Sequence, residues 1–172
     1  MKYLLLVTFG FLLIVFQTMI SNLFFLGKLM VEISLIMTVY AGFKMTLMKG
    51  GLLSFVLGFF LDFFMGSVTG LLAFSYLTIF LISKFVSLRV YSERVAFIMI
   101  FVGLCALLEG IMLMAFYKFA LGADKFHHLW DVVFPQALLE GLLGPSFFTL
   151  FSKFEVLSNG GNTPPFERSA IG

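Results

Sequence analysis

The stretch GGLLSFVLGFFLDFFMGSVTG, residues 50–70, decides the fold class of this chain. Every fourth residue in it is small or acidic, in the order Gly50, Ser54, Gly58, Asp62, Gly66 and Gly70. Residues four apart lie on one face of a helix, so the first half predicts a helix with a groove of small residues. Leu, Phe and Val fill most other positions. Large apolar side chains suit lipid and small ones let a second helix approach, so the stretch is typical of a membrane helix.

This run of small residues crosses a reversal of the chain. We predict that one helix ends near residues 62–65, that Gly66 permits the turn, and that Gly70 belongs to the next helix. The expected structure is a close-packed helical hairpin with Asp62 near the outer end of the groove. Packing against another helix of the same chain is the commoner use of such a groove, and an interface with a partner protein is the alternative.

The composition predicts an integral membrane protein. Of the 172 residues, 61% are hydrophobic and only 12% are charged, and the mean hydropathy is +1.10. Soluble domains carry about 25% charged residues. No polar stretch is long enough to build a soluble domain. The net charge of +2 gives no reason to expect nucleic acid, because the basic residues lie in short loops where membrane topology accounts for them.

We predict an all-α polytopic protein with a single transmembrane domain over residues 1–157. About six apolar segments are present, at roughly 3–20, 29–43, 46–65, 68–83, 95–121 and 132–151, against the 17–25 residues or so that one crossing needs. No small-x-small cleavage site follows Ile20, so the first segment indicates an uncleaved helix. Gly144-Pro145 predicts a kink in the last helix. Residues 158–172 are rich in Gly, Pro and polar residues, which predicts a disordered cytoplasmic tail.

Lys and Arg predict the orientation. With a cytoplasmic N-terminus, one side of the membrane holds Lys2, Lys44, Lys49, Lys84, Arg89, Arg94, Lys153 and Arg168. The other side holds only Lys28, Lys118 and Lys125. Cytoplasmic loops carry the excess of positive charge. We therefore expect a multi-pass protein of the bacterial inner (cytoplasmic) membrane, with both termini in the cytoplasm and the lipid bilayer as its surroundings.

Four acids lie within the apolar segments: Glu32, Asp62, Glu109 and Glu140. Glu109 lies 15 residues after Arg94 and Glu140 lies 13 residues before Lys153, which places both roughly 20 Å from the inner face at 1.5 Å per residue. Asp62 and Glu32 lie near the outer ends of their segments. The sequence therefore predicts an outer pair, Glu32 with Asp62, and a mid-membrane pair, Glu109 with Glu140.

Three roles for these acids remain open. Protonated carboxyl groups can hydrogen-bond between helices and serve structure alone. They can also line an interior polar cavity that receives a partner's side chain or a small ligand. A path for protons or cations is the third role, although the segments carry few further Ser, Thr or Asn side chains to line it.

Catalytic and metal-binding motifs are not evident. His127 and His128 are adjacent, so their side chains point apart, and the nearby Asp124 and Asp131 do not complete a metal-ligand pattern. No nucleophile elbow, phosphate-binding loop, dinucleotide fingerprint or HExxH motif is present. We expect no enzyme activity, no metal and no cofactor. Cys105 is the only cysteine, so no intrachain disulfide forms.

Residues 50–76 resemble the central segment of the rod-shape-determining protein MreD family. That family has a Gly-rich helix ending in Leu-Asp, a following Gly, and then Gly-Leu-x-Ala-x-x-Tyr. These features fall on Gly58, Leu61-Asp62, Gly66, Gly70-Leu71, Ala73 and Tyr76. Glu32 also matches, since it precedes a run of aliphatic residues that ends at Val39-Tyr40, where the family often has an acid before its second helix. The last segment, with Pro135, Gln136 and Pro145, resembles the family's last helix. Glu140 departs from the family, where a neutral amide is more usual.

The resemblance implies a non-enzymatic scaffold or regulatory component of the bacterial cell-elongation machinery, which builds peptidoglycan in rod-shaped cells. Its implied partners are a MreC-like bitopic membrane protein and, through it, a MreB-like filament and the wall synthases RodA and its transpeptidase. The family's fold is similar to the substrate-binding subunits of energy-coupling-factor transporters. That similarity supplies the alternative function, a vitamin-type small-molecule-binding subunit of a transporter.

Overall fold

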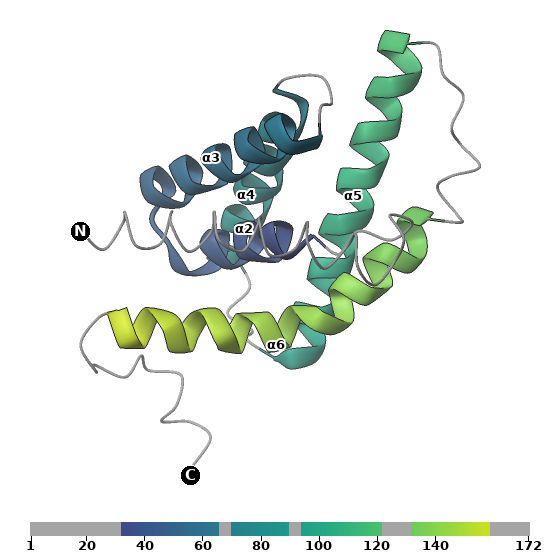
Figure 1. Ribbon diagram of the computed structural model, residues 1–172. Coiled ribbons are helices and arrows are strands. Elements are labelled where there is room, and N and C mark those ends of the chain that lie inside the picture. Colours follow the sequence, from purple (N-terminus) through teal and green to yellow (C-terminus); the bar gives the residue numbers. More distant parts are fainter. Residues whose placement is uncertain (1–31, 66–69, 90–93, 122–131, 159–172) are drawn as a thin grey trace.

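The computed structural model describes residues 32–65, 70–89, 94–121 and 132–158, and these form five α-helices and no strand (Figure 1). The helices are α2 (Ile33–Lys44), α3 (Leu47–Met65), α4 (Leu71–Arg89), α5 (Val95–Leu121) and α6 (Phe134–Ser158). The all-α class is therefore confirmed for this part of the chain. The predicted first helix over residues 3–20, the turn at Gly66 and the predicted tail after residue 158 lie outside the described residues.

The observed helix bounds agree with the predicted segments to different degrees. Helix α5 has the predicted bounds, and α3 begins one residue late. Helix α4 runs six residues beyond the predicted end, to Arg89, and α6 continues past residue 151 to Ser158. Helix α2 has only 12 residues, which is about 18 Å of helix and too short to cross a bilayer on its own.

Two of the described helices are long and apolar enough to cross a membrane. They are α4 and the stretch Val95–Phe119 of α5, whereas α2 is apolar but shorter. Both segments are apolar over most of their length. Helix α4 contains no Gly or Pro, and α5 contains no Pro, so neither helix is interrupted. Among the described residues, α4 and α5 are therefore the two candidate membrane-spanning helices.

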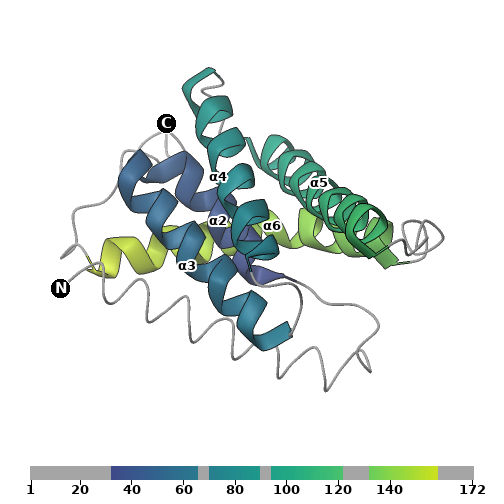
Figure 2. The same cartoon turned by 90° about the horizontal axis from the view of Figure 1, so that it is seen from above.

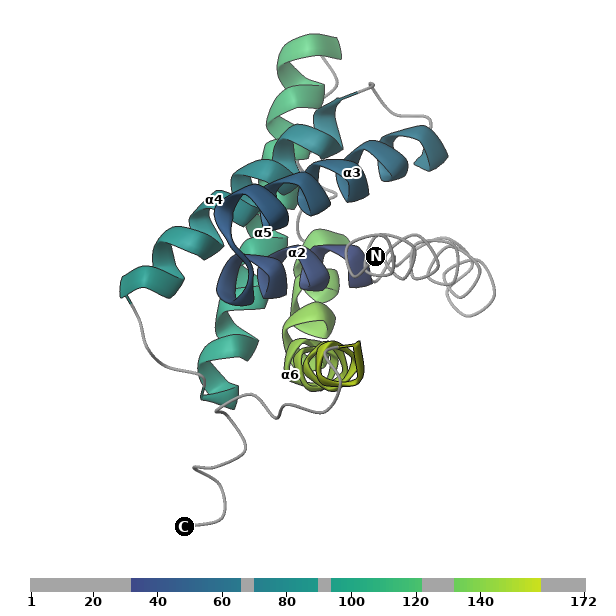
Figure 3. The ribbon, with the colours of Figure 1, turned by 90° about the vertical axis from the view of Figure 1, so that its left-hand side faces the viewer.

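Helix α2 lies at the centre of the fold. Its residues 33–42 are all buried, and it contacts each of the other four described helices. Figures 1 and 3 show α2 with α3 and α4 on one side and α6 on the other, and Figure 2 shows α5 on the far side of α4 from α3. The principal core is accordingly built on α2, with Leu35, Ile36 and Val39 fully enclosed.

The outward faces of the other helices are apolar. Phe63 of α3 is 78% exposed and Phe119 of α5 is 98% exposed. Each of these four helices also presents further large apolar side chains, including Phe59, Phe85, Ile100 and Leu142. Soluble monomers rarely expose apolar surface on this scale. The described surface is therefore suited to lipid or to partner helices.

Helix α6 contains Pro145 in its interior. A proline there removes one helical hydrogen bond and clashes with the preceding turn. Figure 1 shows α6 bending part-way along its length, as the Gly144-Pro145 pair leads us to expect. The bend lets the first half of α6 follow α5 while the second half runs beneath α2.

Candidate functional site

The small-residue face of α3 packs directly on α4. A Cβ atom on Gly58 would lie 2.5 Å from the Cα atom of Ala73, and one on Gly50 would overlap the ring of Phe80. Ser54 is fully buried and donates its hydroxyl to the carbonyl of Gly50 at 2.8 Å. The groove predicted from the sequence is thus filled by a helix of the same chain. The expected helical hairpin is present, as α3 and α4.

Asp62 binds the N-terminus of α4. Its Oδ2 atom accepts hydrogen bonds from the backbone N–H groups of Gly70 at 2.9 Å and Ala73 at 3.1 Å, and its Oδ1 atom accepts from Leu72 at 3.0 Å. The first N–H groups of a helix have no partner within the helix, and the helix dipole favours a negative charge beside them. This carboxylate therefore caps α4 from the preceding helix. Gly70, with a φ of +98°, allows the chain to enter α4 at this point.

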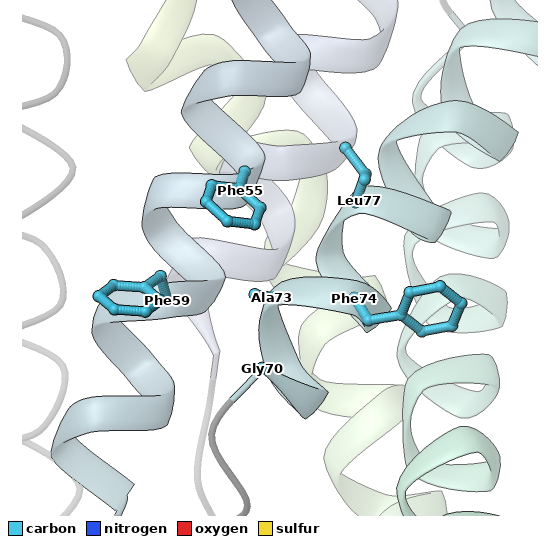
Figure 4. A pocket seen from close by; sticks show the side chains of 6 residues that line it. All are labelled: Phe55, Phe59, Gly70, Ala73, Phe74 and Leu77. Atoms are coloured by element: carbon cyan, nitrogen blue, oxygen red, sulfur yellow. The ribbon is translucent and has the colours of Figure 1, made fainter.

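An apolar groove lies on the outer side of the same hairpin. Figure 4 shows Phe55 and Phe59 of α3 on one wall and Leu77 of α4 on the other, with Gly70 and Ala73 between them. Phe74 completes the lining, and the volume is about 290 Å³. The groove is open to the outside and offers almost no polar atoms, so it suits a hydrocarbon chain or an apolar side chain rather than a polar ligand.

Three buried carboxyl groups meet where α2, α5 and α6 converge. They belong to Glu32 at the N-cap of α2, Glu109 of α5 and Glu140 of α6, which are 6%, 3% and 0% exposed. The backbone N–H of Glu32 donates to Oε1 of Glu140 at 2.9 Å, and the carboxyl group of Glu109 lies close enough to those of Glu32 and Glu140 to interact with them electrostatically. We refer to Glu32, Glu109 and Glu140 as the carboxyl trio.

Neighbouring side chains from three helices complete the trio. The hydroxyl of Tyr76 in α4 donates to Oε2 of Glu32 at 2.8 Å, and it also shares a hydrogen bond with Ser34 of α2 at 2.9 Å. The amide of Gln136 donates to Oε1 of Glu140 at 3.1 Å. These bonds join α2, α4 and α6, and the carboxyl group of Glu109 brings α5 to the same point.

The trio lacks a compensating positive charge among the described residues. No Lys, Arg or His side chain there interacts with any of the three carboxyl groups. Oε1 of Glu109 and Oε2 of Glu140 are buried without a hydrogen-bond partner. Within the same described ranges, no three His, Cys, Asp or Glu side chains are arranged to hold a metal ion.

The pairing of acids predicted from the sequence is wrong for Glu32. The prediction grouped Glu32 with Asp62 near the outer surface, whereas the structure places Glu32 with Glu109 and Glu140 and uses Asp62 as a helix cap. The predicted pairing holds only for straight helices that run along the membrane normal. Helix α2 is short and central, so its N-terminus reaches the interior of the fold.

Glu109 and Glu140 are also not opposite each other. In the contact between α5 and α6, Gly110 meets Val133 and Gly141 meets Gly103. This register offsets the two glutamates by about six residues, or roughly 9 Å along the helices. Glu32 fills the gap, with its carboxyl group toward Glu109 and its backbone N–H toward Glu140.

Two contributors to the site were not predicted from the sequence. Gln136 lies four residues before Glu140, a spacing that places the two side chains side by side on a helix and could have indicated their contact. Ser34, two residues after Glu32, gave no comparable signal. Gly66, also a predicted site residue, lies outside the described residues.

No protein-family model matches this chain, and no curated protein or solved structure is significantly similar to it. The buried polar groups hold helices together, and the outward surface is apolar. Among the described residues, such an arrangement is suited to contact with lipid or with partner helices.

Proposed function

We propose that this chain is a multi-pass inner-membrane protein of the MreD type, a non-enzymatic scaffold in the bacterial cell-elongation machinery. It crosses the membrane about six times with both termini in the cytoplasm, in a fold like that of the energy-coupling-factor substrate-binding subunits. It docks a MreC-like bitopic protein. Through that partner it contributes to the assembly that contains a MreB-like filament, RodA and its transpeptidase.

The observation that carries this proposal is how the buried acids are used. Asp62 caps α4 with three backbone hydrogen bonds, and the backbone N–H of Glu32 ties the central helix to Glu140 of α6. These groups are engaged within the fold and are almost fully enclosed. A rigid core with apolar outer faces supports a role in holding membrane partners.

The residues that resemble the MreD family fit the same role. Gly58 allows α3 and α4 to touch at Ala73, Asp62 caps the second helix of the hairpin, and Tyr76 joins the hairpin to α2. Each one shapes the hairpin on which the rest packs. A motif of this kind is expected in a family whose function depends on a shared scaffold.

The alternative function, a vitamin-binding transporter subunit, requires an enclosed pocket with polar groups that face the ligand. The groove on the α3–α4 hairpin is open and apolar, which favours the scaffold. The two functions also predict different companions. A scaffold associates with a bitopic protein, whereas a transporter subunit associates with an ATPase module and retains its ligand.

The test is purification of the tagged full-length chain from its native membranes in a mild detergent. We expect a protein with one transmembrane helix to co-purify in near-equal amount, together with elongation components. Depletion of the chain should turn rod-shaped cells round. Recovery of an ATPase module with a bound vitamin, and no bitopic protein, would replace the scaffold by the transporter subunit.

A matched pair of variants sharpens this test. Gly58→Leu forces apart the helices of the hairpin, because its side chain meets the backbone of α4, and it should reduce the yield of the complex. Thr149→Val changes an exposed residue whose hydroxyl bonds only its own helix, at Pro145. It should leave the yield unchanged. Normal membrane levels and normal complex yield for Gly58→Leu would contradict the role given to the hairpin.

A further inference from the structure

We propose that one rim of the fold binds the head groups of anionic phospholipids, with Arg89 and Arg94 at the centre of the site. The inference rests on the membrane placement in the proposed function, and it names the class of lipid that the chain binds there. Positive charge gathers at this rim, the described acids lie elsewhere, and exposed apolar side chains stand beside the cations.

Five of the seven Lys and Arg side chains that the structure describes belong to this rim. The ammonium group of Lys84 donates to the carbonyl of Met45 at 2.6 Å, which joins the last turns of α4 to the end of α2. The rings of Phe43 and Phe97, with centroids 6.3 Å apart, bring the first turn of α5 to the same place. Figure 3 shows the last turn of α4 and the first turn of α5 at the same lower end of the fold, with the last turn of α5 at the opposite end. We refer to the five residues as the basic rim: Lys44, Lys49, Lys84, Arg89 and Arg94.

The acids whose side chains the structure describes lie away from the basic rim. Glu32 is the N-cap residue at the opposite end of α2, and its backbone N–H donates to Glu140. Asp62 bonds the first residues of α4, whose last turn lies on the rim. Glu109 lies 15 residues after Arg94, which is about 22 Å along α5 at 1.5 Å per residue. These four acids are therefore too far from the basic rim to neutralise it.

Exposed apolar side chains stand beside the cations of the rim. Phe85 and Leu88, on the last turns of α4, are 62% and 75% exposed, and the guanidinium group of Arg89 lies 5.5 Å from the centroid of the Phe85 ring. Val95, next to Arg94, is 61% exposed. A phospholipid carries a charged phosphate above hydrocarbon chains, so both of its parts find a complement here. A soluble anion or an acidic protein segment would use the charges alone, so the surface favours a lipid.

Arg89 and Arg94 are the members of the basic rim best suited to hold a phosphate. Both side chains are exposed, and a guanidinium group can donate two parallel N–H bonds to one phosphate. The ammonium group of Lys84, by contrast, already serves the carbonyl of Met45. Each Lys or Arg near an anionic membrane surface raises the binding constant about fivefold. The two arginines together should therefore favour an anionic over a zwitterionic lipid by about 25-fold.

The test uses the full-length chain in micelles of a neutral detergent, with mass spectrometry of the intact protein and the lipid that it retains. Phosphatidylglycerol is the anionic probe, and phosphatidylcholine with the same hydrocarbon chains is the zwitterionic probe. We expect the wild-type chain to bind phosphatidylglycerol at least about 25-fold more tightly. This preference should fall as NaCl is added, because salt screens exposed charges. Whether the chain needs detergent to leave the membrane tests its placement separately, so failure of the placement and failure of the lipid site can be distinguished.

The decisive variant combines Arg89→Gln with Arg94→Gln, because it removes two exposed charges and leaves the apolar side chains in place. Its affinity for phosphatidylglycerol should fall by about 25-fold, while its affinity for phosphatidylcholine should not change. Lys118→Gln is the matched control. It removes one exposed charge near the other end of α5, and it should keep the preference for phosphatidylglycerol. Thermal unfolding followed by circular dichroism shows whether both variants fold.

Three results would overturn the proposal. One is a wild-type chain that binds the two lipids equally, and another is a folded double variant that binds phosphatidylglycerol as tightly as Lys118→Gln does. The third is displacement of phosphatidylglycerol by an equal concentration of inorganic phosphate or of poly-glutamate, which would assign the basic rim to a soluble anion or to an acidic protein segment. If the double variant does not fold, the salt titration of the wild-type chain decides the question, and a preference that is insensitive to salt would refute the site.

Discussion

Replacing Asp62 by Ala should cost much of the stability of the α3–α4 hairpin. The substitution removes the acceptor of three backbone N–H groups, at 2.9 Å, 3.0 Å and 3.1 Å. The N–H of Gly70 is partly accessible to water, but those of Leu72 and Ala73 are buried. A buried donor without a partner costs about 1–3 kcal/mol. Two such donors predict that the free energy of unfolding falls by about 2–6 kcal/mol.

Asp62→Asn should be intermediate. Its amide oxygen can take the place of Oδ2, which serves Gly70 and Ala73, but its NH₂ group cannot accept the N–H of Leu72 at the position of Oδ1. One buried donor is then left without a partner, so the expected loss is about 1–3 kcal/mol. The order of stability is wild type, then Asn, then Ala.

Thermal unfolding of the full-length chain in detergent micelles, followed by circular dichroism, measures these losses. At about 2–4 °C for each kcal/mol, Asp62→Ala should lower Tm by about 4–24 °C. Thr78→Val on α4 is the control. It removes an exposed hydroxyl that bonds only to its own helix, at Phe74, and should change stability by less than about 0.5 kcal/mol. A Tm for Asp62→Ala equal to that of this control would refute the capping role.

Three further substitutions test other contacts in the same assay. Gly58→Leu should destabilise the fold by about 3 kcal/mol, the upper end of the usual cost of overpacking, because its side chain meets the backbone of α4. Gly51→Ala is the control: its Cβ would lie at an ordinary 3.5 Å from the nearest atom of the Phe80 ring, so it should be neutral or stabilising. Equal effects of the two would show that close approach is unimportant. Tyr76→Phe should cost about 1–3 kcal/mol, because it removes the hydroxyl that bonds two side chains of α2; an unchanged Tm would contradict this. Lys84→Met should lower the free energy of unfolding by about 1 kcal/mol, because it leaves the carbonyl of Met45 at the end of α2 without its hydrogen-bond donor. An unchanged Tm would show that packing alone holds α2.

The sequence predicted the helices best where apolar residues run without interruption. Val95–Leu121 follows Arg94 and contains no proline, so its pattern and its observed bounds agree. The predicted segment ends at residue 83, just before Lys84, whereas α4 continues to Arg89. In the fold the Lys84 ammonium group reaches the carbonyl of Met45 at 2.6 Å, and the helix continues past it. A long basic side chain can lie along apolar surface while its charged end finds a polar partner.

The sequence indicates many of the residues of the candidate site, but it does not indicate which of them contact one another. The spacing of Gly50, Ser54 and Gly58 indicated close packing because that depends on one helix alone. The partners of Glu32 could not be found in this way. They depend on the angle at which the short central helix α2 packs against α5 and α6, and a hydrophobicity pattern carries no information about that angle. The capping role of Asp62 was missed because the helix that it caps begins nine residues later, beyond the turn.

The hydrogen bond between Glu32 and Glu140 imposes an order on synthesis and assembly. Its two residues are 108 apart in the chain, so at about 5–20 residues per second the ribosome needs roughly 5–20 s to supply the second after the first. The bonds of Asp62 to α4 span only 8 to 11 residues and can form within about 2 s at the same rate. The hairpin is thus available to receive the central helix long before α6 exists. Until α5 and α6 have been made, the side-chain hydrogen bonds that the start of that helix can already form are those with Tyr76.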